Sequence, residues 1–292
     1  MNAMRPSKWI VCLLLSLALW GCGYQPTNVG GVLTDDLYKT SISLSPSATE
    51  IIRGRCQWLE IKGRTAACNY PAGLEQVPVV MNGVKPNYEA IAAAKPDVVV
   101  YDPDLFNEQD LEKFKELGID TFAIGGSTVE EFVDRLIRFA SLTKAEPEMS
   151  EYVDKIHAAS QQAVGAPLEP KPTVAVLIPG EGSEHMIAGL ASFQADIVRK
   201  SGGEPIGPDA KMFVPVNAEM LLQWNPDAIL VAGSVRAIAD DPRLGSLKAL
   251  KSGRTAEIVP DVMLRRGVRV DVLIREVYGF LGRTNPPKEG SE

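Results

Sequence analysis

The chain has 292 residues, enough for two domains of ordinary size, and its formal net charge is −7. Hydrophobic residues make up 45% and charged residues 23%, which is typical of a folded globular protein. The acidic balance argues against nucleic acid or an anionic membrane surface as the main partner.

The N-terminus has the pattern of an export signal. Arg5 and Lys8 precede an uncharged apolar run over residues 9–20, which is too short to span a bilayer comfortably. Leu19-Trp20-Gly21-Cys22 resembles a lipoprotein processing site. We therefore expect a signal peptide over 1–21, a lipid anchor on Cys22 and a location in the periplasm or on the cell surface. An ordinary secretory signal or a short anchor is the alternative.

Two of the four cysteines lie in or directly after this signal, which leaves Cys56 and Cys68. In an oxidising compartment, this pair is expected to form a disulfide. A metal site at the pair is disfavoured because no histidine lies near it in the sequence.

Strands and helices are expected to alternate after a flexible tether at 22–39. A strand at 40–44 leads into Ser45-Pro46-Ser47, where Ser45 has the position of an N-cap and Pro46 suits the first helical residue. Backbone N–H groups at a helix start can bind a ligand oxygen, so Ser45 and Ser47 are candidate contacts. A well-capped helix without a ligand explains the same residues.

One unit of the chain is duplicated. Asn87-Tyr88-Glu89 leads to Lys95-Pro96-Asp97, and Asn217-Ala218-Glu219 leads to Asn225-Pro226-Asp227, with matching positions 130 residues apart. Each copy has the pattern of a capped short helix with an acidic first turn, a proline stop and a buried strand. Solenoid repeats recur every roughly 20–50 residues, so this spacing predicts two similar lobes instead.

The remaining pattern predicts an α/β fold with two lobes, each with a mainly parallel sheet flanked by helices. We expect an N-terminal lobe at 40–126, a helical connector at 127–165, a C-terminal lobe at 172–283 and a disordered tail at 284–292. Further strands are expected at 58–61, 97–101, 120–124, 173–178, 228–232 and 257–259. Further helices are expected at 110–117, 127–141, 148–164, 193–201, 244–250 and 268–281.

No motif for catalysis is present. The sequence has no Gly-x-Ser-x-Gly, no phosphate-binding P-loop and no His-Glu-x-x-His, and its two histidines do not share a helix face. We therefore expect neither catalytic residues nor a metal site. His185 lies in a glycine-rich loop and is either a ligand contact or a solvated histidine.

A basic cluster follows the last expected strand. Arg265, Arg266 and Arg269 stand at a helix start, where guanidinium groups can hold carboxylates or phosphates. A solvated helix start with ordinary surface ion pairs is an equally good interpretation. Arg265 and Arg266 are nevertheless taken as candidate ligand contacts.

The order of these motifs resembles the cobalamin and ferric-siderophore substrate-binding proteins of ABC importers. The resemblance covers residues 41–281, and its motifs are Ser43-Leu44-Ser45-Pro46-Ser47-Ala48-Thr49-Glu50, Tyr70-Pro71 and the two Asn-x-Glu units. It implies two lobes joined by the long helix at 148–164, with a ligand in a cleft between them. It further implies that cobalamin or a ferric siderophore is carried, with Tyr70 among its contacts. Packing of Tyr70 on its own loop is the alternative.

The resemblance also implies that Glu89 and Glu219 dock onto a two-fold membrane permease. The chain would then be a monomeric binding protein without enzymatic activity and without a covalently bound cofactor. The loop at 261–269 carries arginines where cobalamin binders can present an aromatic residue, and this favours an anionic ligand such as a ferric siderophore. Two rival functions are an enzyme of chelatase type and an exported structural lipoprotein without ligand.

Overall fold

The computed structural model describes residues 37–180 and 184–283, which belong to one compact unit. The predicted signal peptide, the Cys22 anchor, most of the tether and the predicted tail at 284–292 lie outside the described residues. Within the part of the chain that is described, no helix is long and apolar enough to cross a membrane.

The first lobe is built on a five-stranded parallel sheet in the order β3-β2-β1-β4-β5. Its central strands, β1 and β4, are almost wholly buried, as expected where helices cover both faces of a parallel sheet. The strands are β1 (Thr40–Ser43), β2 (Glu60–Thr65), β3 (Val79–Met81), β4 (Val98–Tyr101) and β5 (Asp120–Ala123). The helices are α1 (Pro46–Arg55), α2 (Tyr88–Ala94), α3 (Glu108–Glu116) and α4 (Val129–Thr143).

The second lobe holds a sheet in the order β11-β10-β6-β7-β9, with β8 paired to β6. Among the described strands of this sheet, only β7 runs opposite to the others, so the prediction of mainly parallel sheets is confirmed. The strands are β6 (Thr173–Ile178), β7 (His185–Ala188), β8 (Glu204–Pro205), β9 (Phe213–Val216), β10 (Ala228–Ala232) and β11 (Thr255–Ile258). The helices are α6 (Phe193–Lys200), α7 (Ala218–Trp224), α8 (Arg236–Ala239), α9 (Lys248–Lys251), α10 (Pro260–Met263) and α11 (Val270–Leu281).

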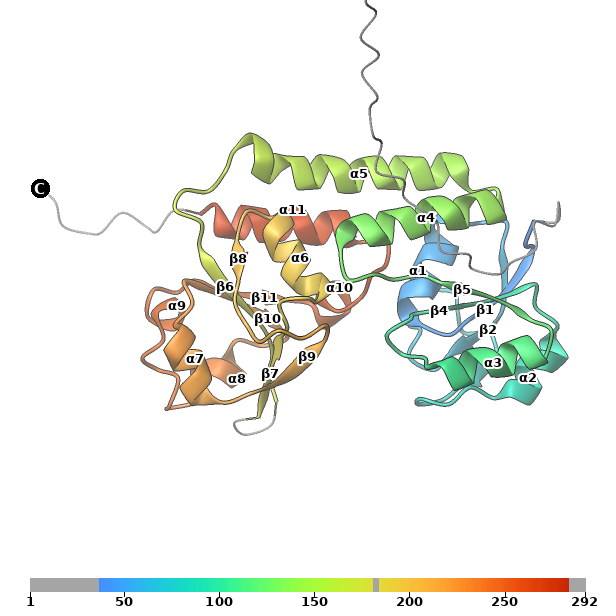
Figure 1. The fold of residues 1–292 in the computed structure, drawn as a ribbon, viewed down its shortest axis with the longest axis horizontal. Coiled ribbons are helices and arrows are strands. Elements are labelled where there is room, and N and C mark those ends of the chain that lie inside the picture. The colour runs from blue at the N-terminus through green and yellow to red at the C-terminus, as the bar shows by residue number, and fades with distance from the viewer. Residues whose placement is uncertain (1–36, 181–183, 284–292) are drawn as a thin grey trace, which may run out of the picture. The chain divides into compact units, whose positions relative to one another are not determined.

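The long connecting helix is α5 (Glu146–Gly165), whose 20 residues span about 30 Å. It lies alongside α4 and α11 (Figure 1). The fully buried Tyr152 of α5 donates its hydroxyl hydrogen to the carbonyl of Gly267 at 2.5 Å and accepts the N–H of Val270 at 3.1 Å. One apolar core runs from α1 and β4 through α4 and α5 to β6 and α11, so the two lobes share a core.

The two copies of the duplicated unit fold alike. The side-chain oxygens of Asn87 and Asn217 accept the backbone N–H three residues further on, at 3.0 and 2.9 Å. Each cap begins a seven-residue helix, α2 or α7. Each helix ends at a residue in the left-handed region, Lys95 with φ 45° and Asn225 with φ 43°.

An aspartate then ties each unit to the first strand of its own sheet. Asp97 accepts the backbone N–H and the hydroxyl of Thr40 at 2.8 and 3.0 Å, and Asp227 accepts both groups of Thr173 at 2.9 Å. Partial burial opposes ionisation of Asp97, but hydrogen bonds from Lys39 and Thr40 lower its pKa overall. The pattern that is duplicated in sequence is therefore duplicated in hydrogen bonding.

Replacing the second cap should measure how much this unit contributes to stability. We expect Asn217→Ala to lower the free energy of unfolding by about 1 kcal/mol, because an N–H of the first turn of α7 loses its acceptor. Chemical denaturation of the purified protein measures this loss. Gln223→Ala, an exposed change on the same helix, should leave stability nearly unchanged, and equal stability of both variants would contradict the capping role.

Candidate ligand-binding site

Loops from four strands meet at the carboxyl edge of the first sheet. Helix α1 starts directly after β1, Asn69 and Tyr70 follow β2, Asp102 and Asp104 follow β4, and Gly126 follows β5. The carboxyl ends of parallel strands lie at one edge of a sheet, where α/β proteins commonly bind their ligands. A ligand-binding site is therefore expected at this edge.

A segment of the second lobe contacts this edge. We call residues 264–269, between α10 and α11, the arginine loop. Tyr152 donates a hydrogen bond to the carbonyl of Gly267 in this loop, and the backbone N–H of Arg266 donates to Ser47 Oγ at 3.2 Å. A Cβ atom on Gly267 would lie 2.2 Å from a carboxylate oxygen of Glu50, so only glycine fits there. The loop is thus fixed against both α1 and α5.

Glu50 of α1 is fully buried and binds two guanidinium groups of the arginine loop. Its Oε1 accepts from Arg265 at 3.2 Å and from Arg269 at 2.6 Å. Arg265 also donates to the side-chain oxygen of Asn69 at 2.7 Å and pairs with Asp261 at 2.7 Å. These contacts join the helix after β1, the loop after β2 and the second lobe.

Arg266 joins the same loop to the strands β4 and β5. Its Nη2 donates to both carboxylate oxygens of Asp102 at 2.7 Å, and its Nη1 pairs with Asp104 at 2.6 Å and donates to the Gly126 carbonyl at 3.0 Å. Burial disfavours the charged guanidinium, but the two carboxylates raise the pKa of Arg266 overall. Arg266 is therefore held as a cation by carboxylates of the other lobe.

These contacts correct four of the predicted ligand contacts. Ser45 and Ser47 are 1% and 5% exposed, and the hydroxyl of each accepts a backbone N–H of the protein itself. Arg265 and Arg266 have side chains only 12% and 11% exposed and are paired with carboxylates. The helix start and the arginines fasten the two lobes to each other and do not form an open anion site.

Tyr70 is the predicted contact that remains accessible. It is 41% exposed, and the guanidinium carbon of Arg269 lies 4.4 Å from its ring centre, within cation–π distance. The ion pairs of the arginine loop with Glu50, Asp102, Asp104 and Asp261 form one network. Two exposed leucines lie next to members of this network in the sequence, Leu105 beside Asp104 and Leu264 beside Arg265. We call the exposed residues of and beside the network the candidate ligand surface: Asn69, Tyr70, Asp104, Leu105, Asp261 and Leu264. The two leucines could not be predicted from the sequence, because an isolated apolar residue carries no motif.

His185 does not belong to this surface. It lies in β7, where it pairs with Val216 of β9, and it is 1% exposed. Its Nδ1 accepts the N–H of Gly180 at 3.3 Å and its Nε2 lies 3.9 Å from a carboxylate oxygen of Asp241. Burial lowers the pKa of His185 although Asp241 opposes this shift. His185 was predicted as a ligand contact, and the structure instead buries it within the second lobe, where it offers almost no accessible surface.

The predicted disulfide is also wrong, since Cys56 and Cys68 are both free and buried. Cys68 Sγ lies 2.9 Å from the hydroxyl of Thr49, whereas Cys56, seven residues beyond Thr49 at the end of α1, accepts from Thr143 at 3.6 Å. Thr49 lies in the first turn of α1 and Cys56 at its C-cap, about 10 Å further along the helix axis, so the two thiols have their hydrogen-bond partners at opposite ends of α1.

A thiol titration tests this correction. A protein lacking residues 1–22, unfolded without reductant, should release two equivalents of thiol to a disulfide reagent. The folded protein should react slowly at pH 8, because both thiols are buried and burial raises the pKa of Cys56 to about 11. If the unfolded protein releases thiols only after reduction, Cys56 and Cys68 do form the predicted disulfide.

Glu89 and Glu219 both lie exposed in the first turn of the duplicated helices α2 and α7.

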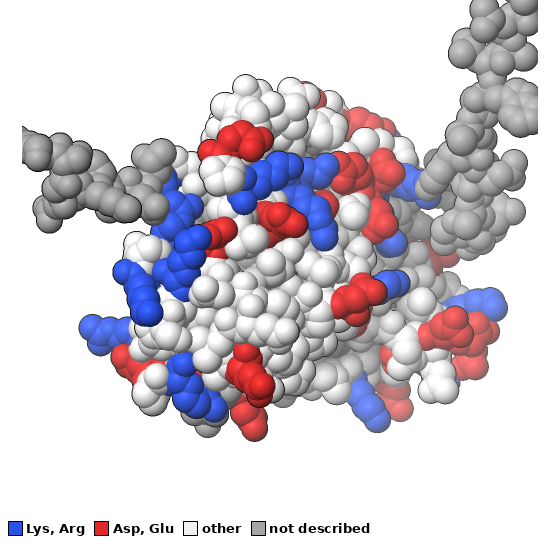
Figure 2. All heavy atoms as spheres, turned by 60° about the vertical axis from the view of Figure 1, so that its left-hand side comes forward, with Lys and Arg blue, Asp and Glu red and all other residues white. Residues whose placement is uncertain are grey.

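On the face of the molecule turned forward in Figure 2, lysine and arginine side chains are interspersed with acidic ones. This face therefore offers no continuous basic surface of the kind that nucleic acid requires.

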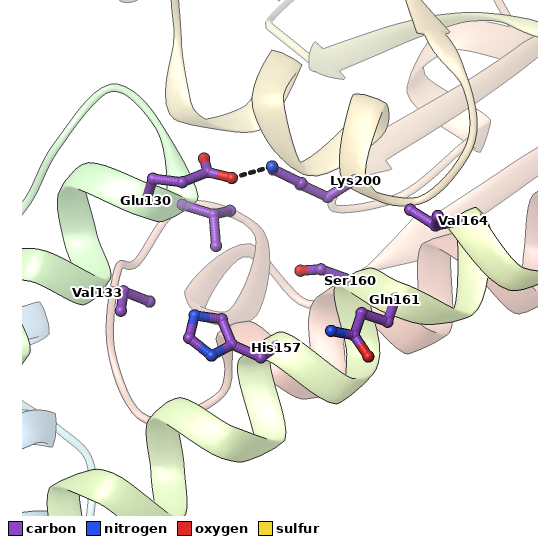
Figure 3. Close-up of a pocket in the computed structure, with 8 residues that line it drawn as sticks. Glu130, Val133, His157, Ser160, Gln161, Val164 and Lys200 are labelled. Atoms are coloured by element: carbon purple, nitrogen blue, oxygen red, sulfur yellow. Dashed lines mark hydrogen bonds and ion pairs between the residues drawn. The ribbon is translucent and has the colours of Figure 1, made fainter. Parts of the chain in front are cut away.

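A groove of about 240 Å³ lies elsewhere, between α4, α5 and α6 (Figure 3). Glu130 of α4 and Lys200 of α6 form an ion pair at its rim, and His157 of α5 faces it. Ligand pockets usually measure about 300–1,000 Å³, so a bulky chelate does not fit here. Among residues 37–180 and 184–283, no group of three or more His, Cys, Asp or Glu side chains is placed to hold a metal ion.

The chain is similar in sequence to known binding proteins. The vitamin B12-binding protein of Salmonella choleraesuis is 26% identical over 230 residues, which cover 78% of this chain and 80% of that protein. An uncharacterized ABC transporter substrate-binding lipoprotein of Bacillus subtilis, YvrC, is 23% identical and covers 94% of this chain and 97% of its own. Both relatives are named as binding proteins, the second as one of an ABC transporter, and the chain is accordingly not an enzyme.

Solved structures show the same fold. The periplasmic vitamin B12-binding protein BtuF of Vibrio cholerae superposes with a TM-score of 0.71 at 19% identity, covering 84% of this chain and 96% of that one. The periplasmic haem-binding protein BhuT in complex with two haems also gives 0.71, at 18% identity, covering 83% and 97%. The family model described as periplasmic binding protein matches residues 42–262. Since that match spans more than half of the sequence, the chain belongs to the periplasmic binding protein family.

Proposed function

We propose that the chain is the extracytoplasmic receptor of an ABC importer and that it carries a chelated-metal ligand, either cobalamin or a ferric siderophore. The ligand would bind between the lobes, against the candidate ligand surface. The observation that carries this proposal is the meeting of the arginine loop with the carboxyl edge of the first sheet, next to the exposed Tyr70. Relatives named for vitamin B12 binding support the choice of ligand class.

Docking on a permease is the second part of the proposal. Glu89 and Glu219 occupy matched positions on two helices that are capped and terminated alike. Two like-charged residues on similar lobes suit a membrane partner with two-fold symmetry, which would present a basic group to each of them. The receptor would act as a monomer on a dimeric permease.

The third part of the proposal is a lipid anchor at Cys22. Members of the family act outside the cytoplasm, and one relative is named a lipoprotein. Cys22 and the apolar run before it have the order of a lipoprotein signal. Mass spectrometry of the membrane fraction should find an acylated N-terminal cysteine, and a protein that is released unmodified would refute the anchor.

Titration calorimetry tests the receptor function. The purified protein lacking residues 1–22 should bind one equivalent of cyanocobalamin, haem or a ferric siderophore with a Kd below about 1 μM, or about −8 kcal/mol. Absence of binding to all of these would refute the proposal and favour a structural lipoprotein.

Tyr70 should contribute strongly to that affinity. We expect Tyr70→Ala to weaken ligand binding about tenfold or more, because an exposed aromatic ring held by Arg269 offers contact area at little entropic cost. Calorimetry with the best ligand of the panel measures the loss. Trp58→Ala is the matched control, since Trp58 is an aromatic residue that is 77% exposed and lies outside the candidate ligand surface. An equal loss in both variants would contradict the assigned surface.

A further inference from the structure

The charges between the lobes are already balanced. The three guanidinium groups of the arginine loop contact four carboxylates, those of Glu50, Asp102, Asp104 and Asp261. The network as a whole therefore carries one excess negative charge. The sequence predicts an anion site at the arginine loop, but carboxylates of the protein itself neutralise the positive charge of this loop.

The four carboxylates are not equally accessible. Glu50 has a fully buried side chain and Asp102 is 7% exposed, whereas Asp104 and Asp261 are each 37% exposed. Asp104 comes from the first lobe and precedes the exposed Leu105, whereas Asp261 comes from the second lobe and accepts a hydrogen bond at 3.1 Å from Asn69, the neighbour of the exposed Tyr70. A ligand on the candidate ligand surface therefore meets carboxylates before it meets a guanidinium.

An anionic ligand in contact with Asp104 and Asp261 would be repelled by their carboxylates. Two unit charges about 4 Å apart interact by about 1 kcal/mol even in water, and more strongly where protein excludes the solvent. A ligand with two or three negative charges would have to approach Asp104 and Asp261 or displace them from their arginines. A ligand whose rim consists of neutral amides and alkyl groups meets no such barrier.

We propose that Asp104 and Asp261 are specificity-determining residues that exclude multiply anionic ligands by occupying Arg266 and Arg265. This inference rests on the proposed receptor function and sharpens it. It favours a chelate with a largely uncharged rim, such as a corrinoid, over haem with two propionates or a ferric tris-catecholate with three negative charges. It also reverses the anionic preference that the arginines alone suggest.

The test compares Asp104→Asn and Asp261→Asn with the wild-type protein. Both changes keep the size of the side chain, and both residues are partly exposed, so each variant should fold. Kd values for cyanocobalamin, haem and a ferric tris-catecholate are measured by calorimetry at low and at physiological salt. Asp154→Asn on α5 removes the same charge from an exposed residue that contacts none of the three arginines and is the matched control.

We expect wild-type protein to bind cyanocobalamin more tightly than either anion. Each of the two asparagine variants should strengthen binding of the anionic chelates roughly tenfold at low salt, and less at physiological salt, and should change their Kd values more than the Kd of cyanocobalamin. Tight binding of an anionic chelate by the wild type, or an effect no larger than that of Asp154→Asn, would overturn the inference and leave the receptor function standing. Binding of no ligand by any variant would overturn both.

Discussion

Glu50→Gln should destabilise the folded protein by about 3–5 kcal/mol, the largest effect we expect from any single substitution. The carboxylate is fully buried and, among the described residues, is the only one that Arg269 contacts, at 2.6 Å, while it shares Arg265 with Asp261. Glutamine keeps the shape but leaves a largely buried guanidinium without its counter-ion. For a domain of this size, the melting temperature should fall by roughly 10 °C.

Thermal and chemical unfolding measure this effect. The matched control is Glu151→Gln on α5, which removes an exposed ion pair with Lys155 and should change stability by less than about 1 kcal/mol. Adding Arg269→Met to Glu50→Gln should recover part of the loss, because the uncompensated charge is then removed as well. A Glu50→Gln protein as stable as the Glu151→Gln control would show that the network does not hold the lobes.

The largest functional effect is expected at the proposed docking residues. Glu89→Arg combined with Glu219→Arg should reduce uptake of the transported ligand to background, because each reversal places like charges opposite each other at the permease. Each single reversal should lower the uptake rate about tenfold or more. Ligand affinity should not change, since both residues lie on α2 and α7, outside the candidate ligand surface.

Glu108→Arg is the control for this experiment. Glu108 is also an exposed first-turn glutamate that follows a capping asparagine, but it stands on α3, outside the duplicated unit. Each single reversal should cost about 0.3–1 kcal/mol of stability through the helix dipole, so stability does not explain a difference in uptake between Glu108→Arg and either single variant. Full uptake by the double variant, or an equal defect in Glu108→Arg, would refute docking through Glu89 and Glu219.

The features predicted correctly from sequence depend on local chemistry. Asn217 and Pro226 delimit α7 through capping and the missing N–H of proline, so neighbouring residues alone determine where the helix begins and ends. The second copy at Asn87 repeats the same chemistry, which is why two similar lobes could be inferred. The long helix α5 was predicted to within two residues at each end from its prolines, Pro147 at its start and Pro167 just beyond its end.

The features that were missed depend on distant partners. β9 contains Pro215 and shows no apolar alternation, and it is a strand only because β7 pairs with it. His185 is buried by that pairing, so its position in a glycine-rich loop was misleading. Glu50 and Arg265 are 215 residues apart in the sequence, and nothing local reveals that they form a pair. The arginines therefore suggested an anion site, whereas the fold supplies their counter-ions.

Hydrogen exchange with and without ligand tests most directly whether a ligand binds between the two lobes. With the tightest ligand of the panel, we predict slower exchange in 66–71, 102–107 and 259–269, which carry the candidate ligand surface. Exchange around His157 and Lys200, at the groove between α4, α5 and α6, should not change. Slower exchange at that groove, with none at the three segments, would contradict the account.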